Sequence, residues 1–206
     1  MVFAFLILIP FTIVTMSLDV MLADIFPSDR IKMKLIDLVA YASDAGFYNL
    51  RPRAVVLPVS EEEVIRLFKL AHKQNIPVVF RTGGTSLSGQ SVTDGILVDL
   101  SQYWRKAIVE NEGGAIRVQP GVIGAVANIY LKKFGRKIGP DPASINAAMM
   151  GGIISNNASG MCCGVSNNSY HTVKYLRFTL PDGKTYSTEV KEDYARFLEE
   201  CPQLSA

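Results

Sequence analysis

Apolar residues follow a strand, helix, strand order between residues 54 and 80. The run Ala54–Leu57 is typical of a short buried strand. Ser60-Glu-Glu-Glu63 predicts a helix start, because serine can cap the backbone N–H three residues later and acidic side chains favour the positive end of a helix. Apolar residues then keep to one helical face through about Asn75, and Val78–Phe80 predicts the next strand.

The rest of the chain continues this mixture of strands and helices. Further strands are expected at 96–100, 115–118, 173–180 and 185–188, and further helices at 122–134 and 190–200. We therefore predict an α+β protein whose first part is a small α/β lobe. In such sheets ligands bind at the carboxyl ends of the strands, so the loop after Phe80 is the first place to look for a site.

The composition is that of a globular protein without a nucleic-acid surface. Of the 206 residues, 49% are apolar and 19% are charged, which suits one large domain or two small lobes with a real core. The net charge of +2 and the scattered basic residues exclude a nucleic-acid footprint. Three cysteines, two of them adjacent at Cys162 and Cys163, give neither a disulfide framework nor metal-ligand spacing. We expect reduced thiols in a cytoplasmic protein.

The first 18 residues carry no charged side chain, and the first basic residue downstream is Arg30. Their length is at the threshold for a membrane span, but a secretory signal would need a positive start and a small-residue cleavage site. A membrane anchor, a packed or disordered extension and a misplaced start all remain open, so membrane association is left as an alternative.

The loop Arg81–Gln90 has the composition of a ligand-binding loop. Two adjacent glycines, Gly83 and Gly84, lack Cβ atoms and let consecutive backbone N–H groups converge on an anion. Four hydroxyl side chains add donors, and Arg81 adds positive charge at the strand end. We predict that this loop cradles a pyrophosphate; the alternative is an ordinary Gly/Ser-rich surface turn.

Two better-known phosphate motifs are excluded. No two glycines lie two positions apart, so the G-x-G-x-x-G dinucleotide fingerprint is absent. The Gly-Lys-Thr at 183–185 follows a Pro-Asp turn and lacks the earlier glycine of a Walker loop.

A second segment repeats the chemistry of the first loop. Residues 139–146 contain two prolines that fix the backbone, and residues 149–160 contain adjacent glycines and short polar side chains. A large flat ligand needs this combination of backbone hydrogen bonds at its polar edge and small apolar residues beneath its face. Tight helix-on-sheet packing with a turn is the alternative.

Six motifs in order resemble the FAD-binding domain of the vanillyl-alcohol-oxidase, or p-cresol methylhydroxylase, superfamily. The chain is most similar to the branch of D-lactate dehydrogenase, the glycolate oxidase D subunit and D-2-hydroxyglutarate dehydrogenase. The resemblance runs from about Ser43 to Thr188. The motifs are Arg53–Pro58 with Ser60–Val64, Arg81–Gln90, Gly95–Ser101, Val118–Gly121, Gly139–Pro142 and Gly151–Gly160.

The resemblance implies that FAD is the cofactor and that backbone amides of Thr82–Ser86 wrap its pyrophosphate. It also implies that Pro140–Ser144 and Gly151–Ser159 line the isoalloxazine and ribityl portions, with the main chain near Val173 reaching towards the adenosine end. The cofactor-binding residues expected on this basis are Arg81, Thr82, Gly83, Gly84, Thr85, Ser86, Leu87, Gly89, Pro140, Asp141, Ser144, Gly151, Gly152, Asn157, Ala158, Ser159 and Val173.

Departures from the family pattern limit what this chain is expected to do. Where a histidine attaches flavin covalently in part of the family, this chain has Thr85, so FAD should be held non-covalently. Relatives continue into a Gly-Ser-Glu-Gly-type flavin segment and a cap domain that often supplies metal-binding histidines and the catalytic base. His72 and His171 have no metal-ligand spacing, so we expect no metal site and no catalytic residue here. Cys162-Cys163 lies where relatives often have Tyr-Gly, so the flavin contact there is open.

We predict a two-lobed flavin domain of the p-cresol methylhydroxylase type that is incomplete at its C-terminus. The expected limits are a hydrophobic extension and lead-in at 1–42, the FAD-binding domain at 43–190 and a truncated tail at 191–206. Its first lobe is expected at about 45–105 and its second at about 106–190, with FAD between them.

The implied activity is oxidation of a small-molecule 2-hydroxy acid, such as D-lactate, glycolate or 2-hydroxyglutarate, by hydride transfer to flavin. Electrons would leave to a quinone, a cytochrome or a fused iron–sulfur module. Three alternatives remain: other chemistry on the same fold, such as alkylglycerone-phosphate synthesis; a non-catalytic truncated product; and a membrane-tethered interaction protein whose glycine loops are only turns.

Overall fold

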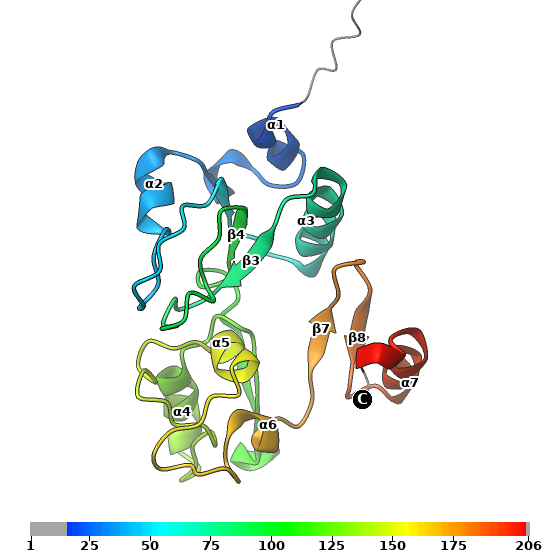
Figure 1. Ribbon diagram of the computed structural model, residues 1–206. Helices are drawn as coiled ribbons and strands as arrows, with labels where there is room; N and C mark the ends of the chain where they lie inside the picture. Colours follow the sequence, from blue (N-terminus) through cyan, green and yellow to red (C-terminus); the bar gives the residue numbers. More distant parts are fainter. Residues whose placement is uncertain (1–15, 205–206) are drawn as a thin grey trace, which may run out of the picture.

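A four-stranded sheet forms the centre of the first lobe, which is the upper part of Figure 1. The computed structural model describes residues 16–204. The strands β1 (Ile31–Lys32), β2 (Ala54–Val56), β3 (Val78–Arg81) and β4 (Ile96–Asp99) have the order β1-β2-β4-β3. β1 is antiparallel to β2, and the other pairs are parallel. Every residue of the two central strands, β2 and β4, is buried, as expected for the middle of a parallel sheet.

The helix α3 (Glu61–Gln74) connects β2 to β3 and confirms the helix predicted from the capping sequence. The Ser60 side chain accepts a hydrogen bond from the Glu63 N–H at 3.3 Å. Asn75 ends the helix in a left-handed conformation with φ 51°, which asparagine tolerates better than most residues. Because β2, β3 and β4 are parallel, the loop that follows β3 starts at the carboxyl edge of the sheet.

The chain before β2 packs onto this lobe. Leu18 and Leu22 of α1 (Leu18–Ala23), together with Phe26, share a buried core with Leu67 of α3. The 3-10 turn η1 (Ser28–Arg30) and the helix α2 (Leu35–Ala40) follow α1. Both helices have six residues, which is too short for a helical period to stand out in the sequence.

The apolar segment 1–18 lies outside the described residues except for its last three. Of these, Leu18 is buried in the core of the first lobe. Between residues 16 and 204, no helix has both the length and the apolar character that a membrane span requires.

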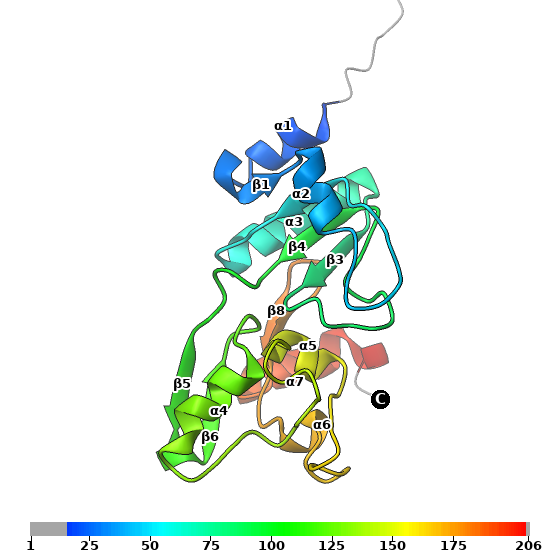
Figure 2. The ribbon, with the colours of Figure 1, turned by 90° about the vertical axis from the view of Figure 1, so that its left-hand side faces the viewer.

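The second lobe combines an antiparallel hairpin with three helices. The hairpin pairs β5 (Ala107–Glu110) with β6 (Ala115–Val118) across the 3-10 turn η2 (Asn111–Gly113). The helices are α4 (Gly124–Lys132), α5 (Met150–Ser155) and α6 (Ser169–Thr172). Side chains from α4, α5 and the inner face of the hairpin form a second buried core. Figure 2 shows α4 alongside the hairpin.

A second hairpin and the helix α7 (Lys191–Glu200) form a third packed unit beside the lobes. The hairpin consists of β7 (Arg177–Thr179) and β8 (Thr185–Ser187), and η3 (Pro202–Leu204) follows α7. Phe178 and the fully buried Tyr186 contact Phe197 of α7, with ring centroids 5.2 and 5.4 Å apart. The segment expected as a tail therefore contains a helix whose aromatic face covers the hairpin.

The strand predicted at 173–180 was too long. Only residues 177–179 pair with β8. Val173 instead ends α6, and its N–H donates to the Ser169 carbonyl at 2.9 Å. Leu176 still exchanges hydrogen bonds of 2.9 Å with Thr188 just after β8, but residues 173–175 pair with no strand and therefore do not form one.

An ion pair inside the first lobe joins the chain before β1 to the start of α3. Arg30 makes two hydrogen bonds of 2.6 Å to the Glu63 carboxylate, and the two side chains are only 13% and 15% exposed. The guanidinium holds the pKa of Glu63 below its ordinary value of 4.5, although partial burial opposes this. The ionised carboxylate also accepts the N–H of Val59 at 2.8 Å.

We expect Glu63→Gln to lower the free energy of unfolding at pH 7 by about 2 kcal/mol, because Arg30 loses a charged partner at a mostly buried site. The native pKa of Glu63 lies below its unfolded value, so the stability from this pair is present above pH 4.5 and is lost as the pH falls through the native pKa. Urea unfolding at several pH values should show a smaller loss of stability on acidification in the variant.

Asp193→Asn is the matched control, because Asp193 pairs with Arg196 on the outside of α7, where the side chains are 31% and 44% exposed. It should change stability by less than about 0.5 kcal/mol. Equal effects of both substitutions would contradict a special role for the Arg30–Glu63 pair.

Candidate functional site

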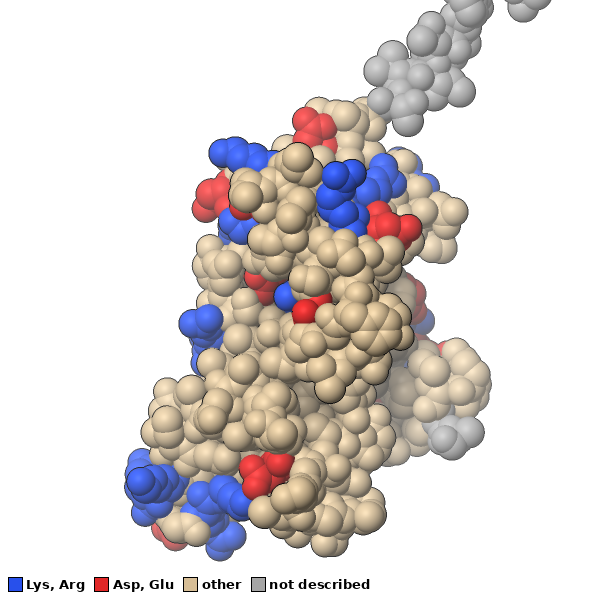
Figure 3. All heavy atoms as spheres, turned by 60° about the vertical axis from the view of Figure 1, so that its left-hand side comes forward, with Lys and Arg blue, Asp and Glu red and all other residues tan. Residues whose placement is uncertain are grey.

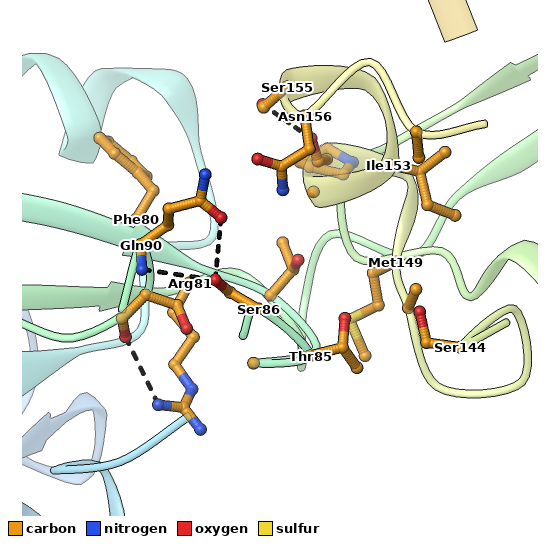
Figure 4. A pocket seen from close by; sticks show the side chains of 18 of the residues that line it. Phe80, Arg81, Thr85, Ser86, Gln90, Ser144, Met149, Ile153, Ser155 and Asn156 are labelled. Carbon is orange, nitrogen blue, oxygen red and sulfur yellow. Dashed lines mark hydrogen bonds between the residues drawn. The ribbon is translucent and has the colours of Figure 1, made fainter. Parts of the chain in front are cut away.

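A cleft of about 510 Å³ separates the two lobes, and both glycine-rich segments border it. One wall is the end of β3 with the loop that follows, and the other is the turn before α5 together with α5 itself (Figure 4). The predicted site residues that line the cleft are Arg81, Thr82, Gly84, Thr85, Ser86, Ser144, Gly151, Gly152 and Ala158. Segments about 60 residues apart in the sequence therefore meet at one cavity.

The other predicted site residues are not among those that line the cleft. They are Gly83, Leu87, Gly89, Pro140, Asp141, Asn157, Ser159 and Val173. Several of them shape the walls by backbone contacts. The Asp141 N–H donates to the Ser159 carbonyl at 2.9 Å, and Gly160, at φ 144°, lies so close to the Asp141 carbonyl that no side chain fits there. Leu87 is 70% exposed at the tip of its loop.

The cleft also contains residues outside the list of expected cofactor-binding residues, although Pro142, Ile153, Ser155 and Asn156 fall within the segments 140–144 and 151–159 that the resemblance places against the flavin. They are Phe80, Gln90, Ser91, Leu100, Pro120, Pro142, Ala148, Met149, Ile153, Ser155 and Asn156. Pro142, Ser155 and Asn156 belong to the second glycine-rich segment and Gln90 ends the first, so their position in the motifs was an available signal. Leu100 and Pro120 come from other parts of the chain, and only the tertiary structure brings them to the site.

Gly83 is the point at which the two walls touch. A Cβ atom on Gly83 would lie 2.5 Å from the carbonyl oxygen of Ala147, a separation that real contacts do not permit. The absence of a side chain therefore lets the first loop lie directly against the turn that precedes α5. Gly83 serves this close approach between the lobes, whereas its neighbour Gly84 lines the cavity.

Arg81 supports the loop from behind. Its guanidinium donates to the Ser43 carbonyl at 2.7 Å and more weakly to the carbonyls of Tyr41 and Ser91 at 3.4 Å. Figure 4 shows this side chain directed away from α5. Backbone carbonyls of the surrounding loops thus hold the Nη1 group of Arg81. Arg81 also lines the cleft, and its contribution of positive charge at the strand end stays a prediction.

Gly84 bends the loop over this arginine. Its φ is 62°, and a Cβ atom there would lie 2.5 Å from an Arg81 guanidinium nitrogen. Its carbonyl accepts the Ala45 N–H at 3.1 Å. The left-handed conformation favours glycine, and any side chain here would also displace the Arg81 guanidinium, so the loop shape depends on this residue.

A pair formed by the half-buried Tyr41 and the buried Asp99 underlies the same region. Tyr41 donates a 2.6 Å hydrogen bond to Asp99, whose position in β4 is opposite Arg81 in β3. The Tyr41 ring also faces the Arg81 guanidinium at 5.6 Å. Burial raises the pKa of Tyr41 above its usual range, and the hydrogen bond to the Asp99 carboxylate adds to this effect. The phenol thus stays protonated as a donor and fixes the end of the strand that leads into the loop.

The cleft is almost uncharged and rich in small polar groups. Among the described residues that line it, none is acidic and Arg81 alone is basic. None of these lining residues is histidine, cysteine or tyrosine. Ser91 is 9% exposed, and its buried hydroxyl oxygen has no hydrogen-bond partner within the described part of the chain. An anionic ligand in this cleft would meet no repelling carboxylate, and it would be contacted by hydroxyl and backbone groups.

The second wall is held by backbone hydrogen bonds to the strand–helix connection after β6. The N–H groups of Met150 and Gly151 donate to the carbonyls of Val122 and Pro120 at 2.8 and 2.9 Å. Gly151 packs on Pro120, and a Cβ atom on Gly151 would lie 2.8 Å from the proline ring. A Cβ atom on Gly152 would have only the Thr82 hydroxyl within 4 Å, at 3.6 Å. A side chain on Gly152 would therefore extend into the cleft.

The histidines and cysteines do not converge. His171 bonds to Asn168 at 2.8 Å through its Nδ1, Cys163 is buried and Cys162 is exposed. Within residues 16–204, no three side chains of metal-ligating type lie close enough together to hold a metal ion.

Comparison with known proteins agrees with this geometry. The family model described as FAD binding domain matches residues 52–189. The chain is 35% identical over 157 residues to D-2-hydroxyglutarate dehydrogenase of Escherichia coli (strain K12), which covers 74% of this chain and 15% of that protein. It is 34% identical over 148 residues to mitochondrial D-lactate dehydrogenase [cytochrome] 1 of Saccharomyces cerevisiae, which covers 68% of this chain and 24% of that protein.

A solved structure confirms the predicted α+β flavin-domain fold. Alkyldihydroxyacetonephosphate synthase superposes with a TM-score of 0.70 and 23% sequence identity, covering 84% of this chain and 34% of that one. At this identity the likeness concerns the fold alone. The chain spans 15% and 24% of the length of the two relatives and 34% of the solved structure. Its similarity to the whole proteins is therefore limited to one segment of each.

We expect Gly83→Ala to separate the two walls, because its methyl group would collide with the backbone carbonyl of Ala147. The free energy of unfolding should fall by about 1–3 kcal/mol, as for other overpacked contacts. Chemical denaturation provides the measurement.

The control is Gly152→Ala, which adds the same methyl group at a helical position where it would be in ordinary contact with the Thr82 hydroxyl, at 3.6 Å. It should leave stability unchanged or raise it by up to about 1 kcal/mol, since alanine favours helix over glycine. If Gly83→Ala were as stable as this control, the contact between the lobes would be wrongly described.

Proposed function

We propose that this chain, which belongs to the FAD binding domain family, is the flavin-holding part of an oxidoreductase that oxidises a D-2-hydroxy acid. The single observation that carries the proposal is the meeting of both glycine-rich segments at one nearly uncharged cleft between the lobes. The relatives support the reaction class, because the two compared here are named as dehydrogenases of D-2-hydroxyglutarate and D-lactate.

The cleft has the properties that FAD requires. Its volume of about 510 Å³ falls within the usual range of ligand sites, about 300–1,000 Å³. The loop 82–86 presents backbone and hydroxyl groups to a cleft that no carboxylate lines, which suits a pyrophosphate. The unpartnered Ser91 hydroxyl would gain a partner from a polar ligand group.

The roles of the residues follow from their positions. Thr82, Gly84, Thr85 and Ser86 would contact the phosphate portion of FAD, and Gly151 and Gly152 with Ser144 would face the flavin and its ribityl chain. Arg81 acts as a positioning residue, since it binds the carbonyls behind the loop. When bound, FAD supplies the electron-accepting chemistry of the oxidation, and the protein holds and orients it.

Non-covalent binding is part of the proposal. Histidine, cysteine and tyrosine are the side chains able to bond to the flavin ring in such sites, and the described lining residues include none of them. Thr85, at the position where some family members carry a histidine, lies in the cleft wall with only a hydroxyl group.

The substrate and the electron acceptor depend on the rest of such a protein. We propose a small 2-hydroxy acid as substrate and a quinone, a cytochrome or a fused iron–sulfur module as acceptor. No carboxylate or histidine in the described lining could take a proton from the substrate, so the base would come from outside this cleft. Alkylglycerone-phosphate synthesis has support from fold likeness alone, at 23% identity.

We expect the purified chain to bind FAD and Gly152→Leu to weaken that binding by about 10-fold or more, because the new side chain would extend into the cleft from a position where its Cβ meets only the Thr82 hydroxyl, at 3.6 Å. Titration of FAD into the protein, followed by flavin fluorescence, gives the affinity. All of the flavin should appear in the supernatant after acid precipitation, since it is not covalently attached.

Ala195→Leu is the control, since it enlarges an exposed helical residue in α7, away from the cleft. It should keep the FAD affinity of the original chain. Equal affinity of Gly152→Leu and Ala195→Leu would show that FAD lies elsewhere, and colourless protein after incubation with FAD would contradict the proposed role.

The reaction class can be tested with a chimera. We expect D-2-hydroxyglutarate dehydrogenase of E. coli to keep part of its activity when residues 52–189 of this chain replace its matching segment, because that segment would supply the same flavin cradle. Oxidation of D-2-hydroxyglutarate is followed with an artificial dye as acceptor. A second chimera, which carries the matching segment of the yeast D-lactate dehydrogenase, serves as the control. A shared reaction would be contradicted if this control were active while the chimera with residues 52–189 bound FAD but had no activity.

A further inference from the structure

A second cavity, a groove of about 350 Å³, runs along the outer side of α4. Ala125, Asn128, Ile129 and Lys132 line it at intervals of three or four residues, so they form one face of the helix. The opposite face of α4 is buried in the core of the second lobe through Ala127 and Leu131. The groove is therefore an outward surface.

The far side of the groove is basic. Arg136 and Lys137, which follow α4, line it together with Asn146. Lys133 lies next to Lys132 in the sequence, and all four cationic residues are exposed. Figure 3 shows lysine and arginine side chains gathered at the lower end of the molecule, where α4 lies.

This short segment holds more than the whole excess charge of the protein. Residues 124–146 contain four basic residues and one acidic residue, Asp141, which is a net charge of +3. The chain as a whole has +2, so the remaining residues sum to −1. The prediction that the basic residues are scattered overlooks this cluster, because Phe134 and Gly135 separate its four basic residues in the sequence.

Most of this charge is not neutralised within the protein. Lys137 pairs with Asp141 at 3.2 Å, whereas Lys132 and Arg136 make no ion pair with any described residue. Lys133 faces the Phe134 ring at 4.9 Å. Elsewhere, Arg30, Arg117 and Arg177 each bind a carboxylate. Unpaired cations around a groove attract a ligand with several negative charges.

Exposed apolar side chains accompany the cations. Ile129 is 68% exposed within the groove, and the neighbouring Tyr130 is 49% exposed. An isolated anion such as phosphate gains nothing from these side chains. An anionic membrane surface offers phosphates for the cations and amides and an apolar layer for isoleucine and tyrosine, a combination typical of interfacial helices.

We propose that the α4 groove binds the phosphate headgroups of an anionic membrane surface. Lys132, Arg136 and Lys137 would contact headgroup phosphates, the Asn146 amide would add a donor, and Ile129 would insert at the boundary with the acyl chains. The flavin cleft stays free, because Ser144 faces the cleft while its neighbours Ile145 and Asn146 face the groove on the other side of the same turn.

The test measures co-sedimentation of the full chain with vesicles of phosphatidylglycerol and phosphatidylcholine. We expect binding to these vesicles and none to pure phosphatidylcholine. The triple variant Lys132→Gln, Arg136→Gln, Lys137→Gln should bind about 100-fold more weakly, from roughly a fivefold contribution of each basic residue near an anionic surface. Raising NaCl from about 0.1 to about 1 M should release the protein, since the Debye length falls from about 10 to about 3 Å.

The matched control is the triple variant Lys69→Gln, Lys73→Gln, Arg51→Gln, which removes the same charge from exposed positions of the first lobe. It should keep most of the vesicle binding. Ile129→Ser should weaken binding several-fold without any change of charge, which a purely electrostatic attraction would not produce.

Equal loss in both triple variants would overturn the proposal, because net charge and not the groove would then govern binding. The proposal would also fail if inorganic phosphate released the protein from vesicles while chloride at the same ionic strength did not. The groove would then be a site for a free anion. Absence of vesicle binding in a protein that binds FAD overturns the membrane proposal alone. If the protein bound vesicles but did not bind FAD, the membrane proposal would stand and the proposed flavin role would fail.

Discussion

The close approach of Gly83 to the Ala147 carbonyl sets the distance between the walls of the cleft. Everything that makes the site usable depends on this contact, because it brings a loop at the carboxyl edge of a parallel sheet against a turn of the other lobe. The rest of the structure maintains it from both sides. Arg81 and the Tyr41–Asp99 pair fix the loop from behind, and backbone hydrogen bonds from Met150 and Gly151 fix the turn.

Much of the fold and of the candidate site could be predicted from the sequence. Where a prediction failed, the failure has a physical reason. Helix α3 was predictable because its cap, its apolar face and its terminal Asn75 are local features. The strand at 173–180 was overestimated because a strand needs a partner, and only residues 177–179 have one. For the site, the two glycine segments were recognised, but the direction of the Arg81 side chain was not. Carbonyl groups of Tyr41, Ser43 and Ser91 decide that direction, and they come together only in the folded chain.

The distribution of charge separates two surfaces of the second lobe. The inner surface, at the cleft, is neutral and carries hydroxyl and backbone groups, so a dinucleotide meets no repelling carboxylate. The outer surface, along α4, carries unpaired cations beside exposed apolar side chains. One turn of chain around Ser144–Asn146 lies between them. A domain built in this way can hold its cofactor on one side of that turn while the other side stays available to a partner.

The unit formed by β7, β8 and α7 has a mechanical consequence. Arg177 in β7 binds Glu61 at the start of α3 through two hydrogen bonds of 2.8 and 2.7 Å, across 116 positions of sequence. On the other side of the unit, Arg117 in β6 of the second lobe binds Glu189, which follows β8, at 2.8 Å. The unit is therefore tied to both lobes, and a change of the angle between the lobes would strain one of these two ion pairs. A ligand that spans both walls of the cleft would oppose the same change of angle.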